Sequence, residues 1–245
     1  MVLLKLRRMP DGNEALAAWV HRGMISKADF AQARADMVEH QIARRGVRDP
    51  LVLDAMARIP REAFVLSGWE DEAYEDQPLP IADRQTISQP FIVAFMVETA
   101  GLRPGDRALE IGTGSGYAAA VMAAIAARVY TIERHPTLAK AARTRLRELG
   151  FGNVEVRVGD GTLGWPEAQP FDAIIVTAGG PKVPAELREQ LAIGGRLVIP
   201  VGDSMHRQSL VRVVREGPEK YLEEALADVA FVPLIGEAGW DPSRR

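Results

Sequence analysis

The residues Leu109-Glu-Ile-Gly-Thr-Gly-Ser-Gly-Tyr117 are the most informative part of this 245-residue chain for predicting its fold. It joins an apolar run, Ala108 to Ile111, to an alanine-rich helical pattern from Tyr117 to Ala127. Its three glycines let the backbone turn tightly and come within contact of a ligand, where a side chain would intrude. A strand, a ligand-binding turn and a helix are therefore predicted in direct succession.

Downstream of this stretch, apolar strand-like runs continue to alternate with helical runs. The expected strands are 108–111, 129–132, 154–158, 173–177 and 196–201, and the expected helices are 117–127, 138–149 and 184–191. This alternation predicts a parallel sheet with helices on both faces, because continuous apolar strands such as Ala173-Ile-Ile-Val176 suit a sheet that is buried on both sides. Two late strands, 209–215 and 225–232, are expected to join antiparallel through Glu216-Gly217-Pro218. The fold class is α/β, with a doubly wound, seven-stranded, mostly parallel sheet.

Upstream of Pro104-Gly105 the pattern is helical. Helices are expected over 36–45, 50–57 and 91–100, the last opened by Ser88-Gln-Pro90, with a looser stretch over 69–84. Residues 13–34 show short helical patterns, and Ser26-Lys-Ala-Asp29 is a capping pattern, an oxygen acceptor followed three residues later by an acid. The chain is therefore divided into an N-terminal helical extension (1–35), a helical segment with an active-site loop (36–104) and a ligand-binding core (105–245).

Composition narrows the function classes. A hydrophobic fraction of 47% and a charged fraction of 26% are ordinary for a globular protein. The net charge of -3 provides no basic field that would attract nucleic acid. No run approaches the roughly 18 to 20 apolar residues of a membrane span, and the first residues hold too short an apolar run for a signal peptide. We expect a cytoplasmic protein that binds neither membrane nor nucleic acid.

Several kinds of catalytic site are disfavoured. The absence of cysteine excludes disulfides, thiolate metal sites and cysteine nucleophiles. The histidines His21, His40, His135 and His206 fall in separate segments without metal-ligand spacing, so no metal is expected. Ser115 lies in the glycine turn rather than in a G-x-S-x-G elbow after a strand, which argues against a hydrolase, and a nucleotide P-loop motif is absent.

Acidic residues mark the carboxyl ends of three consecutive predicted strands. Glu110 precedes the first glycine of the turn, Glu133 ends the next strand, and Asp160 lies between two glycines after the third. A negative charge at Glu110 would repel a pyrophosphate but suits a ligand that carries ammonium and sulfonium charges. The simpler alternatives are a solvated strand end for Glu133 and a turn residue for Asp160. Together the three acids favour S-adenosylmethionine over a dinucleotide, because ligands of open α/β sheets bind at these strand ends.

With these residues the chain resembles the class I methyltransferases, which have a Rossmann-like fold. The sequence around them is similar to one family of that class, the protein-L-isoaspartate O-methyltransferases. Four stretches carry the narrower resemblance, together with Pro60-Arg-Glu-Ala-Phe64: Arg84-Gln-Thr-Ile-Ser-Gln-Pro90, Phe171-Asp-Ala-Ile-Ile-Val-Thr-Ala178, Gly194 to Gly202, and Phe231-Val-Pro-Leu234. The similarity spans roughly residues 37 to 234, and residues 1–35 lie outside it.

The resemblance implies an enzyme that esterifies the L-isoaspartyl carboxylate of damaged proteins and peptides with a methyl group from S-adenosylmethionine, releasing S-adenosylhomocysteine. The ester then collapses to a succinimide and reopens partly to normal aspartate, which is repair. The implied cofactor-binding residues are Glu110, Gly112, Thr113, Gly114, Ser115, Gly116, Glu133, Arg134, Asp160 and Gly161. The implied substrate-binding residues are Gln85, Thr86, Ile87 and Ser88, with Ser88 as the catalytic residue. No metal takes part, and we expect a monomer.

Some positions depart from the family pattern. Ala82 and Arg84 stand where the family usually has glycines, so the loop before Gln85 is expected to be stiffer or narrower. Val93 and Ile235 replace a histidine and a threonine that some members carry. From the residues alone, Ser88 is also a candidate N-cap for the helix that begins near Pro90.

Two other functions stay open at this stage. One is methylation of a small molecule, a ribosomally made peptide or a nucleic acid, although Ala178-Gly-Gly-Pro181 stands where base methyltransferases often carry an Asn-Pro-Pro-Tyr-like motif. The other is a module that binds the cofactor without turnover. Methyl transfer to a carboxylate that is already ionised at pH 7 requires no general base, so the expected role of Ser88 is to orient the substrate.

Overall fold

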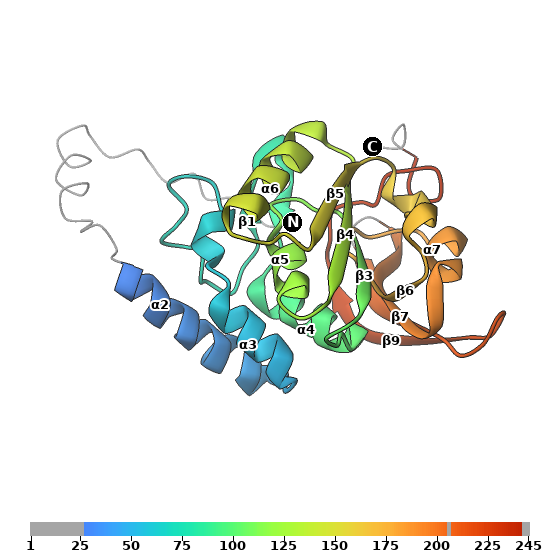
Figure 1. The fold of residues 1–245 in the computed structure, drawn as a ribbon, viewed down its shortest axis with the longest axis horizontal. Helices are drawn as coiled ribbons and strands as arrows, with labels where there is room; N and C mark the ends of the chain where they lie inside the picture. The colour runs from blue at the N-terminus through green and yellow to red at the C-terminus, as the bar shows by residue number, and fades with distance from the viewer. Residues whose placement is uncertain (1–26, 205–206, 242–245) are drawn as a thin grey trace.

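The computed structural model describes residues 27–204 and 207–241. Within these ranges, seven strands form one sheet in the order β5-β4-β3-β6-β7-β8-β9 (Figure 1). The strands are β3 (Arg107–Ile111), β4 (Arg128–Glu133), β5 (Val154–Val158), β6 (Phe171–Val176), β7 (Leu191–Ser204), β8 (Arg207–Arg215) and β9 (Tyr221–Val229). The first five strands of this order, β5-β4-β3-β6-β7, pair in parallel with their neighbours. The pairs β7-β8 and β8-β9 are antiparallel. The predicted mostly parallel, seven-stranded sheet is confirmed.

The central strands are apolar on both faces. In β6, Ala173 and Ile175 belong to one buried cluster, whereas Ile174 and Val176 belong to another on the opposite side. Successive side chains of a strand point to opposite faces, so a continuous apolar run supplies two cores at once.

Helices cover both faces of this sheet (Figure 1). Residues of α4 (Pro90–Ala100), α5 (Tyr117–Ala123) and α6 (Pro136–Glu148) pack in the first cluster. Leu187 of α7 (Ala185–Glu189) packs in the second. The doubly wound arrangement therefore follows from the strand-helix alternation along the chain.

The segment before α4 consists of short helical pieces. They are α2 (Lys27–Asp36), a π-helix (Met37–Ile42), a 3₁₀ turn (Ala43–Arg45), α3 (Pro50–Arg58) and the 3₁₀ turn η3 (Arg61–Phe64). The Asp49 carboxylate accepts a hydrogen bond from Leu51 N at 3.0 Å and caps α3, which has Pro50 in its first turn. Met56 of α3 and Phe64 are buried in the same cluster as α4 and α5, so this segment packs on the sheet domain.

Some boundaries differ from the predicted ones. The helix expected over 117–127 ends at Ala123. The strand expected over 225–232 runs from Tyr221 to Val229, because it pairs with β8 from Gln208 to Arg215. Helix α2 crosses the expected boundary at residue 35, and the expected domain division stays a prediction. Ser26 of the capping pattern, and the rest of 13–26, lie outside the described residues. A short two-stranded sheet joins β1 (Leu79–Pro80) to β2 (Thr86–Ile87).

Candidate active site

The glycine stretch lies at the point where the strand order reverses. From β3 the chain proceeds to β4 and β5 on one side, and then returns to β6 on the other side of β3. Connections that leave two neighbouring strands in opposite directions open a crevice at their carboxyl ends. Two adjoining cavities of about 370 and 70 Å³ lie there, and both are lined by Thr86, Gly112, Gly114, Thr177 and Val232. We refer to them as the larger and the smaller cavity.

The three glycines of the turn all have positive φ, at 98° for Gly112, 52° for Gly114 and 90° for Gly116. A Cβ atom on Gly112 would collide with the hydroxyl of Thr177, which donates to the Gly112 carbonyl at 2.8 Å. Any side chain at Gly112 would therefore break the contact between the ends of β3 and β6 as well as strain the backbone.

Glu110 is the most deeply buried acid of the site. Its Oε2 accepts a hydrogen bond from the Thr131 hydroxyl at 2.5 Å, and its Oε1 has no hydrogen-bond partner among the described residues. Burial raises the pKa of the Glu110 carboxyl to about 8, against the Thr131 hydrogen bond and with help from the charge of Glu133. The sequence predicted a negative charge on Glu110, and this prediction is corrected. Because the pKa lies above 7, the Glu110 carboxyl is mostly protonated at pH 7 when no cation lies beside it.

Glu133 and Arg134 line the smaller cavity. The Glu133 carboxylate accepts from Gly114 N at 2.8 Å and from His135 N at 2.9 Å, and the residue is only 5% exposed. The alternative of a solvated strand end is therefore wrong for Glu133. Its carboxylate ties the glycine turn to the end of β4 and retains acceptor capacity toward the cavity.

Asp160 is placed differently from its neighbour Gly161, which lines the smaller cavity. Its Oδ1 accepts from Thr162 N at 2.9 Å and its Oδ2 accepts from Glu237 N at 2.8 Å. It caps a 3₁₀ turn and faces a separate open depression, which it shares with Arg134. Asp160 therefore acts as a turn residue in this structure, and its expected role toward adenine stays a prediction.

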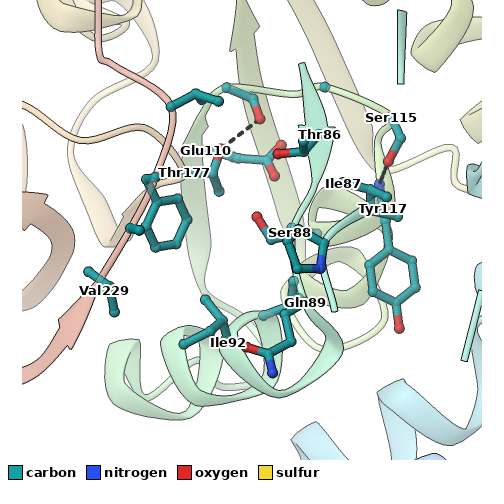
Figure 2. A pocket seen from close by; sticks show the side chains of 18 of the residues that line it. Thr86, Ile87, Ser88, Gln89, Ile92, Glu110, Ser115, Tyr117, Thr177 and Val229 are labelled. Carbon is teal, nitrogen blue, oxygen red and sulfur yellow. Dashed lines mark hydrogen bonds between the residues drawn. The ribbon is translucent and has the colours of Figure 1, made fainter. Parts of the chain in front are cut away.

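The segment from Gln85 to Ser88 borders both cavities. Gln85 lines the smaller cavity, Thr86 lines both, and Ile87 and Ser88 line the larger one, into which the Ser88 side chain is directed (Figure 2). Glu110, Gly112, Thr113, Gly114 and Ser115 also line the larger cavity, while Gly116 packs beside α6 instead.

The alternative role of Ser88 as a helix cap is wrong. Helix α4 begins at Pro90, and its N-cap is Gln89, which makes no side-chain cap hydrogen bond. In the part of the chain that the structure describes, the Ser88 hydroxyl has no hydrogen-bond partner. This hydroxyl is therefore available to a ligand in the larger cavity.

Further cavity residues were not predicted from the sequence. Thr177 lines both cavities, and Tyr117, Phe231 and Val232 complete the wall of the larger one. Thr177 had a readable signal, because it ends a predicted buried strand and such positions lie at the binding edge of a parallel sheet. Phe231 belongs to a stretch that carries the family resemblance, but its place in the cavity was not predicted, since only the tertiary fold brings the chain after β9 back to this edge.

The site offers no metal centre in the described ranges 27–204 and 207–241, where His, Asp and Glu side chains form no cluster suited to a metal ion. Within the same ranges, no helix is both long and apolar enough to span a bilayer. The expected absence of a metal stays a prediction.

A sheet of this order, with a glycine turn and flanking acids at its switch point, defines the methyltransferase class. The chain belongs to the protein-L-isoaspartate(D-aspartate) O-methyltransferase family, whose model matches residues 32–239. It is 58% identical over 207 residues to protein-L-isoaspartate O-methyltransferase 2 of Pelobacter propionicus, covering 84% of this chain and 92% of the relative.

Solved structures agree with this assignment. A protein-L-isoaspartate O-methyltransferase superimposes with a TM-score of 0.77 at 31% identity, covering 84% of this chain and 67% of the other. A putative member from Plasmodium falciparum, in complex with S-adenosyl-L-homocysteine, superimposes with a TM-score of 0.70 at 25% identity, covering 82% and 98%.

Proposed function

We propose that this protein uses S-adenosylmethionine to methylate the free carboxylate of L-isoaspartyl residues in damaged proteins and peptides, and so begins their repair. The observation that carries the proposal is that Ser88 and Glu110 line one cavity, at the switch point of a sheet whose chain belongs to the isoaspartyl methyltransferase family. The Ser88 hydroxyl, which has no hydrogen-bond partner in the ranges 27–204 and 207–241, is the group suited to receive a carboxylate there.

The residues around the glycine turn fit the cofactor. Gly112 and Gly114 line both cavities with main-chain atoms, and the Oε1 of Glu110, which has no hydrogen-bond partner among the described residues, provides an acceptor for a cationic ammonium group. In this proposal Glu133 accepts from the ribose hydroxyls, and Gly161 and Arg134 border the adenosine. The cofactor supplies a methyl group on a positively charged sulfur, and it requires no metal for this transfer.

The protein contributes orientation and a water-poor site. The substrate carboxylate is ionised at pH 7, so no side chain has to remove a proton. The Ser88 hydroxyl donates to one carboxylate oxygen and leaves the other free to face the methyl group. Apolar side chains of Ile92, Val93 and Phe231 line the same cavity and limit water, which favours the neutralisation of carboxylate and sulfonium as the bond forms.

The test is methyl transfer to a pair of peptides that differ only in an isoaspartyl or a normal aspartyl residue. We expect base-labile, radiolabelled ester on the isoaspartyl peptide alone. Ser88→Ala should lower kcat by about 10- to 150-fold, the value of a hydrogen bond to a charged group, and leave the Kd of the cofactor within about twofold.

The other outcomes separate the rival functions. Equal rates on the two peptides contradict isoaspartyl repair, and transfer to small carboxylic acids alone indicates a small-molecule methyltransferase. Tight binding of S-adenosylmethionine without any transfer indicates a non-catalytic module. A Ser88→Ala protein with the kcat of the wild type removes Ser88 from the site.

A further inference from the structure

Arg61 is a completely buried arginine beside the active-site segment. It is 0% exposed and lies in η3, outside the residues that line either cavity. Burying a guanidinium is unfavourable unless its N–H groups find acceptors, and burial lowers the pKa of Arg61 below its ordinary value. Its retention in the core requires a reason other than filling space.

The guanidinium of Arg61 joins two segments that are distant in the sequence. Its Nη2 donates to the main-chain carbonyl of Ser88 at 2.8 Å, and its Nε donates to the carbonyl of Ala73 at 2.7 Å. Its third nitrogen, Nη1, has no hydrogen-bond partner in the described part of the chain. The Ser88 carbonyl is therefore held by a charged donor that is itself fixed to the loop around Ala73.

Arg61 also contacts a second residue that lines the larger cavity. Its guanidinium carbon lies 4.8 Å from the ring centroid of Tyr117, the residue that follows the glycine turn. Tyr117 is in turn packed edge-on against Phe64 of η3, with 5.5 Å between the ring centroids. A single side chain thus connects the Ser88 main chain with the start of α5, and Ser88 and Tyr117 both line the larger cavity.

We propose that Arg61 is a positioning residue for methyl transfer, which holds the main chain of Ser88 at a set distance from the glycine turn. The inference rests on the proposed function for its kinetic readout. Hydrogen bonds from a charged donor are stronger than those between neutral groups, and misplacement of a reacting group by about 1 Å can lower turnover by about two orders of magnitude.

Arg34 provides a matched control, because it contacts Tyr74 and Glu62, the residues that follow Ala73 and Arg61 in the chain. Its Nε donates to the Tyr74 hydroxyl at 2.9 Å and its Nη2 pairs with Glu62 at 3.4 Å, while Tyr74 also donates to Glu62. Its side chain is 16% exposed. Arg34 therefore stabilises the contact of α2 with the residues next to Arg61 and Ala73, without any bond to Ser88.

The experiment compares Arg61→Met and Arg61→Lys with Arg34→Met in the full chain. We expect Arg61→Met to lower kcat on an isoaspartyl peptide by about 10- to 100-fold, with the Kd of S-adenosylhomocysteine within about twofold. Arg61→Lys, which keeps the charge but lacks the forked donors that reach two carbonyls, should recover only part of this loss. Arg34→Met should change the melting temperature but leave kcat within about twofold of the wild type.

Amide hydrogen exchange over residues 85–89 gives a readout that does not depend on activity. Exchange there should accelerate by about tenfold or more in Arg61→Met and stay as in the wild type in Arg34→Met. If the wild type does not methylate isoaspartyl peptides, the proposed function is refuted. The exchange measurement would still test whether Arg61 holds the main chain of Ser88.

Three results would overturn the role of Arg61. They are an unchanged kcat and exchange in Arg61→Met, an equal loss of kcat in Arg34→Met, and failure of both Arg61 variants to fold where Arg34→Met folds. The last result would mean that Arg61 acts on folding rather than on the position of Ser88.

Discussion

Among the single residues of the site, Glu110 is one whose burial lowers the stability of the folded protein. Its carboxyl is buried with one oxygen that has no partner among the described residues, and such burial is unfavourable for a charged group. The group is held neutral by its surroundings and becomes an anion when a cation is placed beside it. This behaviour supports the proposed role of Glu110 toward the cationic group of the cofactor.

The pKa of Glu110 predicts a pH dependence of stability. The carboxyl has an ordinary pKa of 4.5 when unfolded and about 8 when folded, so the folded protein holds more protons between these values. The free energy of unfolding therefore falls as pH rises from about 4.5 to about 8, by at most about 1.4 kcal/mol for each pH unit.

The measurement for Glu110 is the melting temperature of the ligand-free protein from pH 5 to pH 9. We expect that of the wild type to decline, and that of Glu110→Gln, which stays neutral, to decline less. The two curves should diverge as pH rises and run parallel above about pH 8. Parallel curves across the whole range would mean that Glu110 does not titrate in this window.

At the scale of elements, the turn η4 (Ala82–Arg84) shows how a local exception is stabilised by its neighbours. Asp83 and Arg84 have φ values of 55° and 58°, the left-handed region that side chains rarely adopt. The turn is held between β1 and β2, whose antiparallel pairing of Leu79 with Ile87 fixes both ends of the loop.

Strain in this turn predicts opposite effects for two glycine substitutions. Arg84→Gly should stabilise the protein by about 1 kcal/mol. A residue with a Cβ pays about 1 to 2 kcal/mol for the left-handed conformation, and the larger conformational entropy that glycine loses on folding offsets only part of this gain. Ala82→Gly, at a position without positive φ, should destabilise it by about 0.5 to 1 kcal/mol. Urea unfolding of both variants is the check, and a shift of the same sign for both would contradict the argument.

At the scale of the whole molecule, the cavity depends on contacts between the far strands and the chain that follows them. The amide of Gln208 on β8 accepts from Phe231 N at 2.9 Å and donates to Phe231 O at 3.1 Å. Gln208 is 3% exposed, and Phe231 lines the larger cavity. A strand on the antiparallel side of the sheet thus positions one wall of the site.

A matched pair of glutamines tests this long-range support. Gln190 is 5% exposed and bridges Trp165 N and Leu163 O in the same two-pronged way, outside both cavities. Gln208→Leu and Gln190→Leu should each cost about 1 to 3 kcal/mol per backbone group left unpaired. Only Gln208→Leu should also raise KM for the isoaspartyl peptide, by about tenfold. An equal rise in both variants would attribute the effect to lost stability instead.

Much of the fold was predictable because it depends on patterns of residues that are close together in the sequence. The alternation of apolar strands with helices, the glycine turn after Ile111 and the antiparallel late strands are local properties of the chain, and the structure confirms them. The strand boundaries were less predictable. β7 and β9 extend beyond their apolar cores because pairing with neighbours, rather than composition, decides where a strand ends.

For the site, the residue pattern was enough to predict which residues stand at strand ends, and the surrounding motifs were enough to identify the family. The protonation of these residues and their neighbours could be found only from the folded chain. The tertiary structure raised the pKa of Glu110, turned Asp160 toward Glu237, and brought Arg61 and Phe231 to the cavity region from segments far apart in the chain. The burial of a side chain, the charges around it and the residues that it contacts all depend on neighbours from distant parts of the sequence. These neighbours come together only when the chain folds, so the linear sequence does not show them.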